Sequence, residues 1–172
     1  RMMNLEVESR WDGSPCPDKT IRGEFTVERE ESGLRITAKA PKFSVEHQPN
    51  APTGTRFDGL WEFDVLEIFF VGENGKYIEI ELGTAGHYLV LGFDGVRRRS
   101  NDFHDMSFDH SFKREDDGST ISTILIPNEI LPTVITRANA FVIANQEFLS
   151  HAPLPGAKPD FHQPSEYPIM SV

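Results

Sequence analysis

The sequence predicts an all-β protein, a single antiparallel β-sandwich. Strand-like runs separated by turn residues fill most of the 172-residue chain. The 13 phenylalanines favour strands, and the 13 glycines and 12 prolines supply turns. Only residues 127–132, PNEILP, resemble a helix, and they form at most about two turns. Short strands with almost no helix are typical of sandwiches and barrels.

The first half of the chain contains a predicted hairpin, in which residues 20–30 pair with residues 33–40. Period-two alternation predicts that its apolar side chains face the core: Ile21, Phe25, Val27, Leu34, Ile36 and Ala38. A loop rich in proline and glycine follows. The other predicted strands are residues 3–11, 60–72, 77–82, 87–95, 106–115, 119–127 and 139–148. The proline-rich tail, residues 151–172, is expected to wrap over the same domain, which spans residues 1–172.

The stretch LWEFDVLEIFFVGENGKYIEIEL, residues 60–82, places acidic residues inside an apolar run. Its turn can close as a two-residue loop or as the three-residue loop 73–75 with Gly75 left-handed. The longer loop sets the apolar residues 66, 68 and 70 opposite residues 82, 80 and 78, and this hydrophobic match decides the register. Glu67 then lies directly opposite Glu81. Like charges in that position are destabilising, so the pair requires a compensating interaction.

The next turn, GTAG at residues 83–86, is read as a four-residue loop that joins Leu82 to His87. This register puts Tyr88 opposite Glu81 and leaves Leu89 and Leu91 on the apolar face. The predicted polar face therefore carries Glu67, Glu79, Glu81 and Tyr88. Trp61 lies at the start of the strand that contains Glu67. Carboxylates accept hydroxyl hydrogens and aromatic rings cover the apolar face of a pyranose, so this patch is the candidate ligand site.

Composition excludes several classes of function. The formal net charge of −10 repels a phosphate backbone, so we expect no nucleic-acid partner; residues 97–99, RRR, are a solvated strand end that could contact one anionic group. The single Cys16 permits no intramolecular disulfide. No apolar run reaches membrane-spanning length and the start lacks a signal core, so we expect a cytoplasmic protein without a membrane partner, unless a signal peptide was removed earlier. Oligomeric state is not predicted.

Several motifs carry a family resemblance. Residues 61–67, with Trp61, Asp64 and Glu67, resemble the Asp-x-x-Glu strand of family-nine carbohydrate-binding modules and of the wider DOMON-like sandwiches. Those modules hold a sugar between two tryptophans, and this chain has only two, Trp11 and Trp61. Three further motifs carry a closer resemblance: residues 11–15 (WDGSP), 40–43 (APKF) and 158–162 (KPDFH). They resemble an uncharacterised family whose human member is named for an open reading frame of chromosome 4. The resemblance implies an antiparallel, jelly-roll-like β-sandwich of the carbohydrate-binding-module type, and it implies no known activity.

Three functional hypotheses follow. The first is a non-catalytic domain that binds a carbohydrate or related polar small ligand, with this set of site residues: Trp61, Glu67, Glu81, Tyr88, Trp11 and His162. The second is a hydrolase of a glycan-like substrate in which Glu67 and Glu81 form the acid/base pair. The third is a structural or interaction domain whose carboxylates only form ion pairs with residues such as Arg22, Arg35 or Lys39. We expect a binding role rather than an enzymatic one, and no cofactor, although Glu67 and Glu81 could hold a cation such as Ca²⁺.

Overall fold

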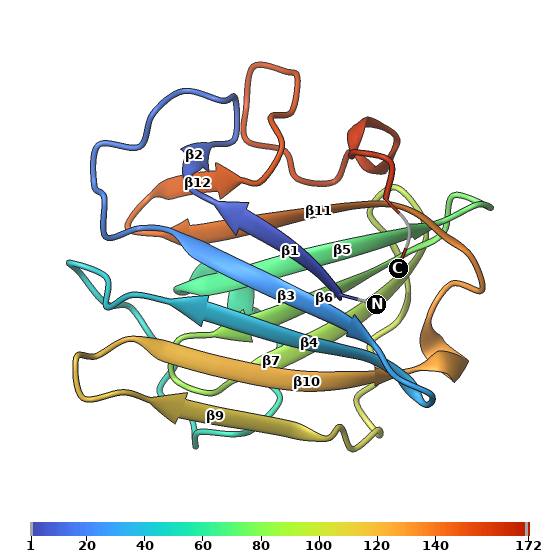
Figure 1. The fold of residues 1–172 in the computed structure, drawn as a ribbon, viewed down its shortest axis with the longest axis horizontal. Coiled ribbons are helices and arrows are strands. Elements are labelled where there is room, and N and C mark those ends of the chain that lie inside the picture. Colours follow the sequence, from blue (N-terminus) through green and yellow to red (C-terminus); the bar gives the residue numbers. More distant parts are fainter. Residues whose placement is uncertain (1, 171) are drawn as a thin grey trace.

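Two antiparallel sheets pack face to face in the computed structural model, which describes residues 2–170 and 172 (Figure 1). The first sheet has the strand order β1 (Met2–Val7), β3 (Gly23–Arg29), β4 (Gly33–Ala40), β10 (Thr120–Pro127) and β9 (His110–Arg114). The second has the order β2 (Ser9–Arg10), β12 (Glu147–Ser150), β11 (Ile135–Ala144), β5 (Val65–Gly72), β6 (Tyr77–Gly83), β7 (Tyr88–Gly95) and β8 (Arg98–Asn101). The predicted all-β sandwich is confirmed.

Helical structure in the described residues is limited to short 3-10 segments: η1 (Leu60–Glu62), η2 (Asn128–Ile130) and η3 (Pro164–Glu166). The segment η2 lies where the sequence predicted a short helix. Along residues 2–170 and 172, no helix is both long and apolar enough to cross a membrane.

The main core lies between the two sheets. Alternate side chains of β3 and β4 point into it, and all six residues predicted to face inward from that hairpin are buried. The second sheet contributes the matching apolar side chains of β5 and β6, such as Ile68 and Ile80, which are 0% exposed. Burying apolar surface at about 25 cal/mol per Å² is the dominant favourable term for such a fold.

A second apolar cluster covers the other side of the seven-stranded sheet. The tail that follows β12 packs there: the ring of Phe161 stacks on Phe141 of β11 with centroids 4.1 Å apart, and Tyr167 is fully buried. An antiparallel β-bridge that places Arg137 opposite Ile169 connects the end of the tail to β11; its hydrogen bonds run from Ala138 N–H to the Pro168 carbonyl and from Met170 N–H to the Thr136 carbonyl. As a result β5 and β6 are buried on both of their faces.

Two predicted strands are divided in the structure. Residues 3–11 split into β1 and β2, which belong to different sheets. Residues 139–148 form most of the β11–β12 hairpin, because Asn145 and Gln146 both adopt positive φ (47° and 62°), the backbone of a type I′ turn. The edge strand β8 was not predicted.

The two turns of the β5–β6–β7 meander are alike. In the first turn the Gly72 N–H donates to the Lys76 carbonyl, and in the second the Gly83 N–H donates to the His87 carbonyl, each over 2.8 Å. Each turn encloses a three-residue loop that ends in a left-handed glycine, Gly75 or Gly86. Glu67 therefore pairs with Glu81, as predicted. The register predicted for β6–β7 is wrong by one residue: Glu81 pairs with Leu89, and Tyr88 pairs with Leu82.

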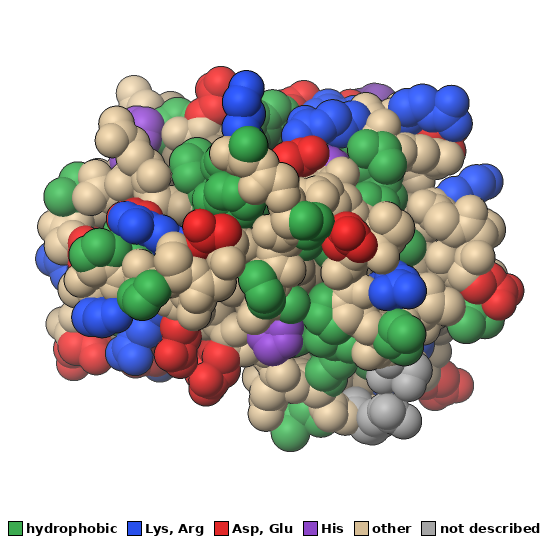
Figure 2. Space-filling model, turned by 90° about the horizontal axis from the view of Figure 1, so that it is seen from above, with side chains coloured by type: hydrophobic (Ala, Val, Ile, Leu, Met, Phe, Trp, Pro, Cys, Tyr) green, Lys and Arg blue, Asp and Glu red, His purple; other side chains and the backbone are tan. Residues whose placement is uncertain are grey.

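Figure 2 shows the molecule from above Figure 1, the side on which β12 and the tail lie. Hydrophobic, basic and acidic side chains are interspersed on this face. The excess of acidic residues in the chain is therefore not gathered into one acidic patch here.

Candidate functional site

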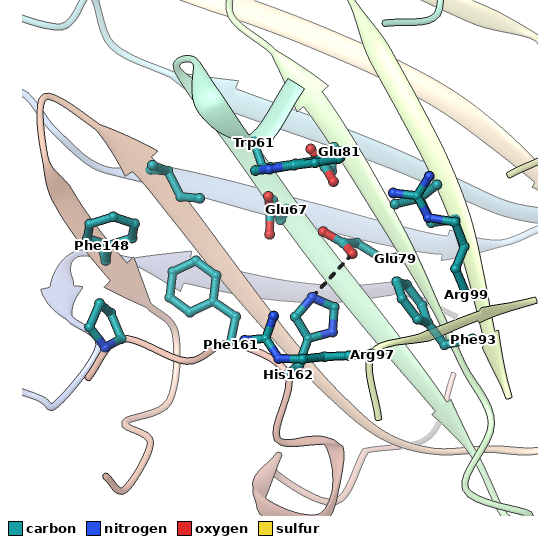
Figure 3. Close-up of a pocket in the computed structure, with 13 residues that line it drawn as sticks. Trp61, Glu67, Glu79, Glu81, Phe93, Arg97, Arg99, Phe148, Phe161 and His162 are labelled. Atoms are coloured by element: carbon teal, nitrogen blue, oxygen red, sulfur yellow. Dashed lines mark ion pairs between the residues drawn. The ribbon is translucent and has the colours of Figure 1, made fainter. Parts of the chain in front are cut away.

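A pocket of about 340 Å³ lies on the outer face of the seven-stranded sheet, away from the main core (Figure 3). Strands β5 and β6 provide its floor and η1 part of its rim. Other lining residues come from β7, β8, β11, β12 and the tail. The full lining is Trp61, Glu67, Glu79, Glu81, Leu91, Phe93, Arg97, Arg99, Ile143, Phe148, Pro159, Phe161 and His162.

Three carboxylates form the floor of the pocket. Glu67 is on β5, and Glu79 and Glu81 are on β6; alternation along each strand and the Glu67–Glu81 pairing bring all three to the same face. One oxygen from each lies within 4.8 Å of the other two. All three residues are at most 3% exposed. We refer to them as the carboxylate trio.

Half of the trio's six carboxylate oxygens lack the partners that buried charges require. Both oxygens of Glu81 and the Oε2 atom of Glu67 are buried and accept no hydrogen bond. Burial, followed by the charges of the other trio members, raises the pKa of Glu67 and Glu81 well above its usual range. Burial also raises the pKa of Glu79, and its side-chain interactions with Glu81 and Glu67, followed by the charges of Arg99 and Arg97, oppose that increase. The trio therefore retains protons to higher pH than carboxylates in water do.

His162 is held over the trio by a hydrogen-bond chain. The Arg97 main-chain N–H donates to the Tyr77 hydroxyl oxygen (3.0 Å). The Tyr77 hydroxyl in turn donates its proton to His162 Nδ1 (2.8 Å). This assigns the ring proton to Nε2, which lies 3.8 Å from Glu79 Oε1 (Figure 3). Burial and Arg97 lower the pKa of His162 to about 4, so the ring is neutral at pH 7.

Two arginines form one wall of the pocket, and each already has a partner. Arg97 has positive φ (58°) and its guanidinium bonds Asp160. The guanidinium of Arg99 lies 5.8 Å from the centroid of the Trp61 ring and 3.6 Å from Asp58. Both line the pocket without forming an ion pair with the trio among the described residues.

Trp61 is exposed at the rim. It belongs to η1 and not to a strand, and 39% of its surface is accessible, whereas its neighbour Leu60 is fully buried. Figure 3 shows the Trp61 side chain beside Glu67 and Glu81. The indole thus offers an apolar surface next to the carboxylates.

The pocket brings together Trp61, Glu67, Glu81 and His162, four of the six residues predicted for the site. Tyr88 is outside it: the one-residue register difference turns its ring toward the main core, 4.8 Å from the His110 ring. Trp11 lines a different pocket, which shares only Phe148 with this one. The two tryptophans therefore do not line one pocket.

The sequence analysis missed both arginines of the wall and the rings of Phe93, Phe148 and Phe161. The run at residues 97–99 was the available signal for the arginines, and it was interpreted as a solvated strand end. The suggested ion pairs with the trio are also absent from the described residues; Arg35, for example, pairs with Glu30 and Asp109.

No protein-family model matches the chain. It is 31% identical over 173 residues to the mouse UPF0462 protein C4orf33 homolog, covering 94% of this chain and 87% of the mouse protein. The chain belongs to the UPF0462 family. The zebrafish homolog is 28% identical over 172 residues (94% of this chain, 85% of that protein), and the human protein is 28% identical over 173 residues (93% and 83%).

A solved structure with the same fold comes from Bacteroides uniformis, where the protein is described as a "putative carbohydrate-binding protein". It superposes with a TM-score of 0.74, covering 99% of this chain and 85% of the other, at 17% sequence identity. The likeness establishes that this member of the UPF0462 family has the fold of that protein.

Proposed function

We propose that the pocket binds a carbohydrate or a closely related polar small molecule, and that it does so without cleaving it. The observation that carries this proposal is the set of unpaired, buried carboxylate oxygens of Glu67 and Glu81 beside the exposed Trp61. Ligand hydroxyls supply the hydrogen-bond donors that these oxygens lack, and the indole packs against ligand C–H groups. The description of the structural neighbour from Bacteroides uniformis agrees with this class of ligand.

The size and lining of the pocket support a small ligand. Its volume of about 340 Å³ is near the lower end of the 300–1,000 Å³ that is usual for small-molecule sites. Apolar rings such as Phe93 and Phe161 surround a few convergent polar groups. The ligand should therefore be of monosaccharide size, or be the end of a longer glycan.

The arrangement of the trio favours binding over hydrolysis. A glycosidase places two carboxyl groups on either side of the scissile bond. Glu67 and Glu81 are cross-strand neighbours that project from one sheet face, so both approach a ligand from the same side. The hydrolase hypothesis therefore receives no support from their positions.

The test is a screen of monosaccharides and short oligosaccharides by thermal shift, followed by calorimetric titration of each hit. We expect Trp61→Ala and Glu67→Gln each to weaken binding about tenfold or more, equivalent to at least about 1.4 kcal/mol. Trp11→Ala is the matched control, because Trp11 lines another pocket, and it should keep the wild-type affinity.

Two results would overturn the proposal. One is a complete screen in which no sugar raises the melting temperature of the wild-type protein. The other is release of product from a bound glycan, detected by chromatography, that is lost in Glu67→Gln; it would establish the hydrolase instead.

A further inference from the structure

We propose that the carboxylate trio holds a hard divalent cation at the floor of the pocket, and that this cation offers open coordination positions to the ligand. The first half of this proposal concerns the trio alone. The second half rests on the proposed function, because it requires a ligand with hydroxyl or other oxygen donors.

The spacing of the trio suits one ion. The three carboxylate oxygens lie within 4.8 Å of one another, about twice the 2.3–2.6 Å of a Ca²⁺–oxygen bond. A single cation placed among them can therefore contact Glu67, Glu79 and Glu81 together. Because the three residues sit on paired strands of a rigid sheet, their spacing does not depend on a mobile loop.

An independent observation is the lack of any other partner for Glu81. This residue is 0% exposed, and neither of its carboxylate oxygens accepts a hydrogen bond. A buried carboxylate without a partner is costly, and an ion removes that cost directly. Within residues 2–170, no Lys or Arg nitrogen lies within 4.0 Å of the trio's oxygens.

The donor atoms point to the class of cation. Three carboxylates form an all-oxygen set, which suits Ca²⁺, Mg²⁺ and Mn²⁺ better than soft metals that select thiolates. His162 Nε2 faces Glu79 at 3.8 Å but is not part of the group of mutually close ligand atoms. It is placed to bond a water or a ligand atom next to the ion.

The position of the trio leaves the ion accessible. The backbone of β5 and β6 closes one side, and the cavity lies on the other. Each carboxylate offers one oxygen to the group of mutually close atoms, so an ion that takes six or more ligands keeps positions for water or for ligand hydroxyls. The cation and Trp61 then contact the same bound molecule.

The experiment uses the full chain, stripped with EDTA and dialysed, and titrates it with Ca²⁺, Mg²⁺ and Mn²⁺ separately at pH 7.5. We expect one ion per chain by calorimetry and a raised melting temperature with at least one of the three. Glu81→Gln should weaken that binding at least tenfold. Glu24→Gln, which changes an exposed carboxylate on β3 of the other sheet, should bind as the wild type does.

Near-ultraviolet circular dichroism checks that Glu81→Gln is folded, and Glu67→Gln provides a second variant of the trio. The cation site is wrong if none of the three ions binds the wild-type chain at concentrations up to about 10 mM, since even weak Ca²⁺ sites in proteins have Kd values of about 1 mM or less. It is equally wrong if both trio variants bind the ion as tightly as the wild type.

Sugar binding with and without EDTA separates the two proposals. A sugar that binds equally well in EDTA keeps the proposed function and removes the bridging role of the ion. An ion that binds with no sugar response in its presence keeps the cation site and removes the proposed function. A sugar affinity that falls at least tenfold in EDTA supports both.

Discussion

The two faces of the β5–β6 hairpin are equally buried but chemically opposite. Toward the first sheet, Ile68 pairs with Ile80 in the main core. One residue along each strand, Glu67 pairs with Glu81 on the floor of the pocket. The same backbone thus holds an apolar pair and an acidic pair, each with almost no exposure to solvent.

This contrast separates residues that stabilise the fold from residues that do not. Burying an isoleucine contributes about 1.5–3 kcal/mol. Burying a carboxylate whose oxygens have no partner costs free energy, as the raised pKa of Glu67 and Glu81 reflects. The inner face therefore explains why the hairpin folds, and the outer face requires a ligand or an ion to explain its composition.

The largest expected change in the free energy of unfolding comes from a substitution on the inner face of the hairpin. Ile80→Ala removes buried methyl and methylene groups and leaves a cavity between the sheets, so it should lower the free energy of unfolding by about 3 kcal/mol. Urea denaturation at pH 7 measures it. A loss below about 1 kcal/mol would mean that this face is not packed as a core.

A change of the opposite sign in the free energy of unfolding is expected at Glu81, the residue that follows Ile80. In metal-free protein at pH 8, Glu81→Gln should raise the free energy of unfolding by about 1–3 kcal/mol, because an uncharged amide replaces a buried carboxyl group whose oxygens have no partner, and the amide can donate to Glu67 or Glu79. The same urea experiment measures the gain. A loss comparable to that of Ile80→Ala would show that Glu81 has a structural partner and would remove the contrast.

The contrast was predictable from the sequence because β6 alternates between apolar and acidic residues and β5 carries a single acidic residue, Glu67. In YIEIEL, apolar and acidic residues alternate, so only one pairing register gives a continuous apolar face. Gly75 adopts the left-handed backbone that the loop of this register requires. The second turn, at Gly86, has the same geometry, but the β6–β7 register predicted from it was wrong by one residue. Residues 88–91, YLVL, are apolar at every position because β7 is covered on both sides, and a run without alternation cannot select a register.

The pocket walls were harder to predict than the floor. Glu67, Glu79 and Glu81 are close in sequence and are placed by one hairpin. Arg97 reaches the pocket from the turn between β7 and β8, and Phe161 reaches it from the tail. No periodicity relates such distant segments, so their meeting depends on tertiary packing that local patterns do not encode.

The pH dependence of stability should also distinguish the two faces. Groups around Glu81 that carry or can gain charge are Glu67, Glu79, His162, Arg97 and Arg99. Because the pKa of Glu81 is raised on folding, the folded state holds more protons than the unfolded state between about pH 4.5 and the raised value. Stability of metal-free protein should therefore fall as pH rises through this window, by at most about 1.4 kcal/mol per pH unit for one carboxyl.

His162 acts in the other direction, since its pKa is lowered to about 4 and it destabilises the fold as pH falls below about 6.5. Subtracting the stability of Glu81→Gln from that of the wild type at each pH cancels this contribution. The difference should become more negative with rising pH. A flat difference from pH 5 to pH 9 would contradict the raised pKa of Glu81.

The smallest expected effect concerns the hydrogen-bond chain above the trio. Tyr77→Phe removes the hydroxyl that links the Arg97 main chain to His162 Nδ1, at a cost of about 1 kcal/mol in the free energy of unfolding. Because a donor to Nδ1 stabilises the neutral ring, its loss should also raise the pKa of His162 from about 4 toward its ordinary value, measured by NMR titration. Tyr88→Phe, whose ring faces the main core, should leave that pKa unchanged. An equal shift in both variants would mean that Tyr77 does not orient His162.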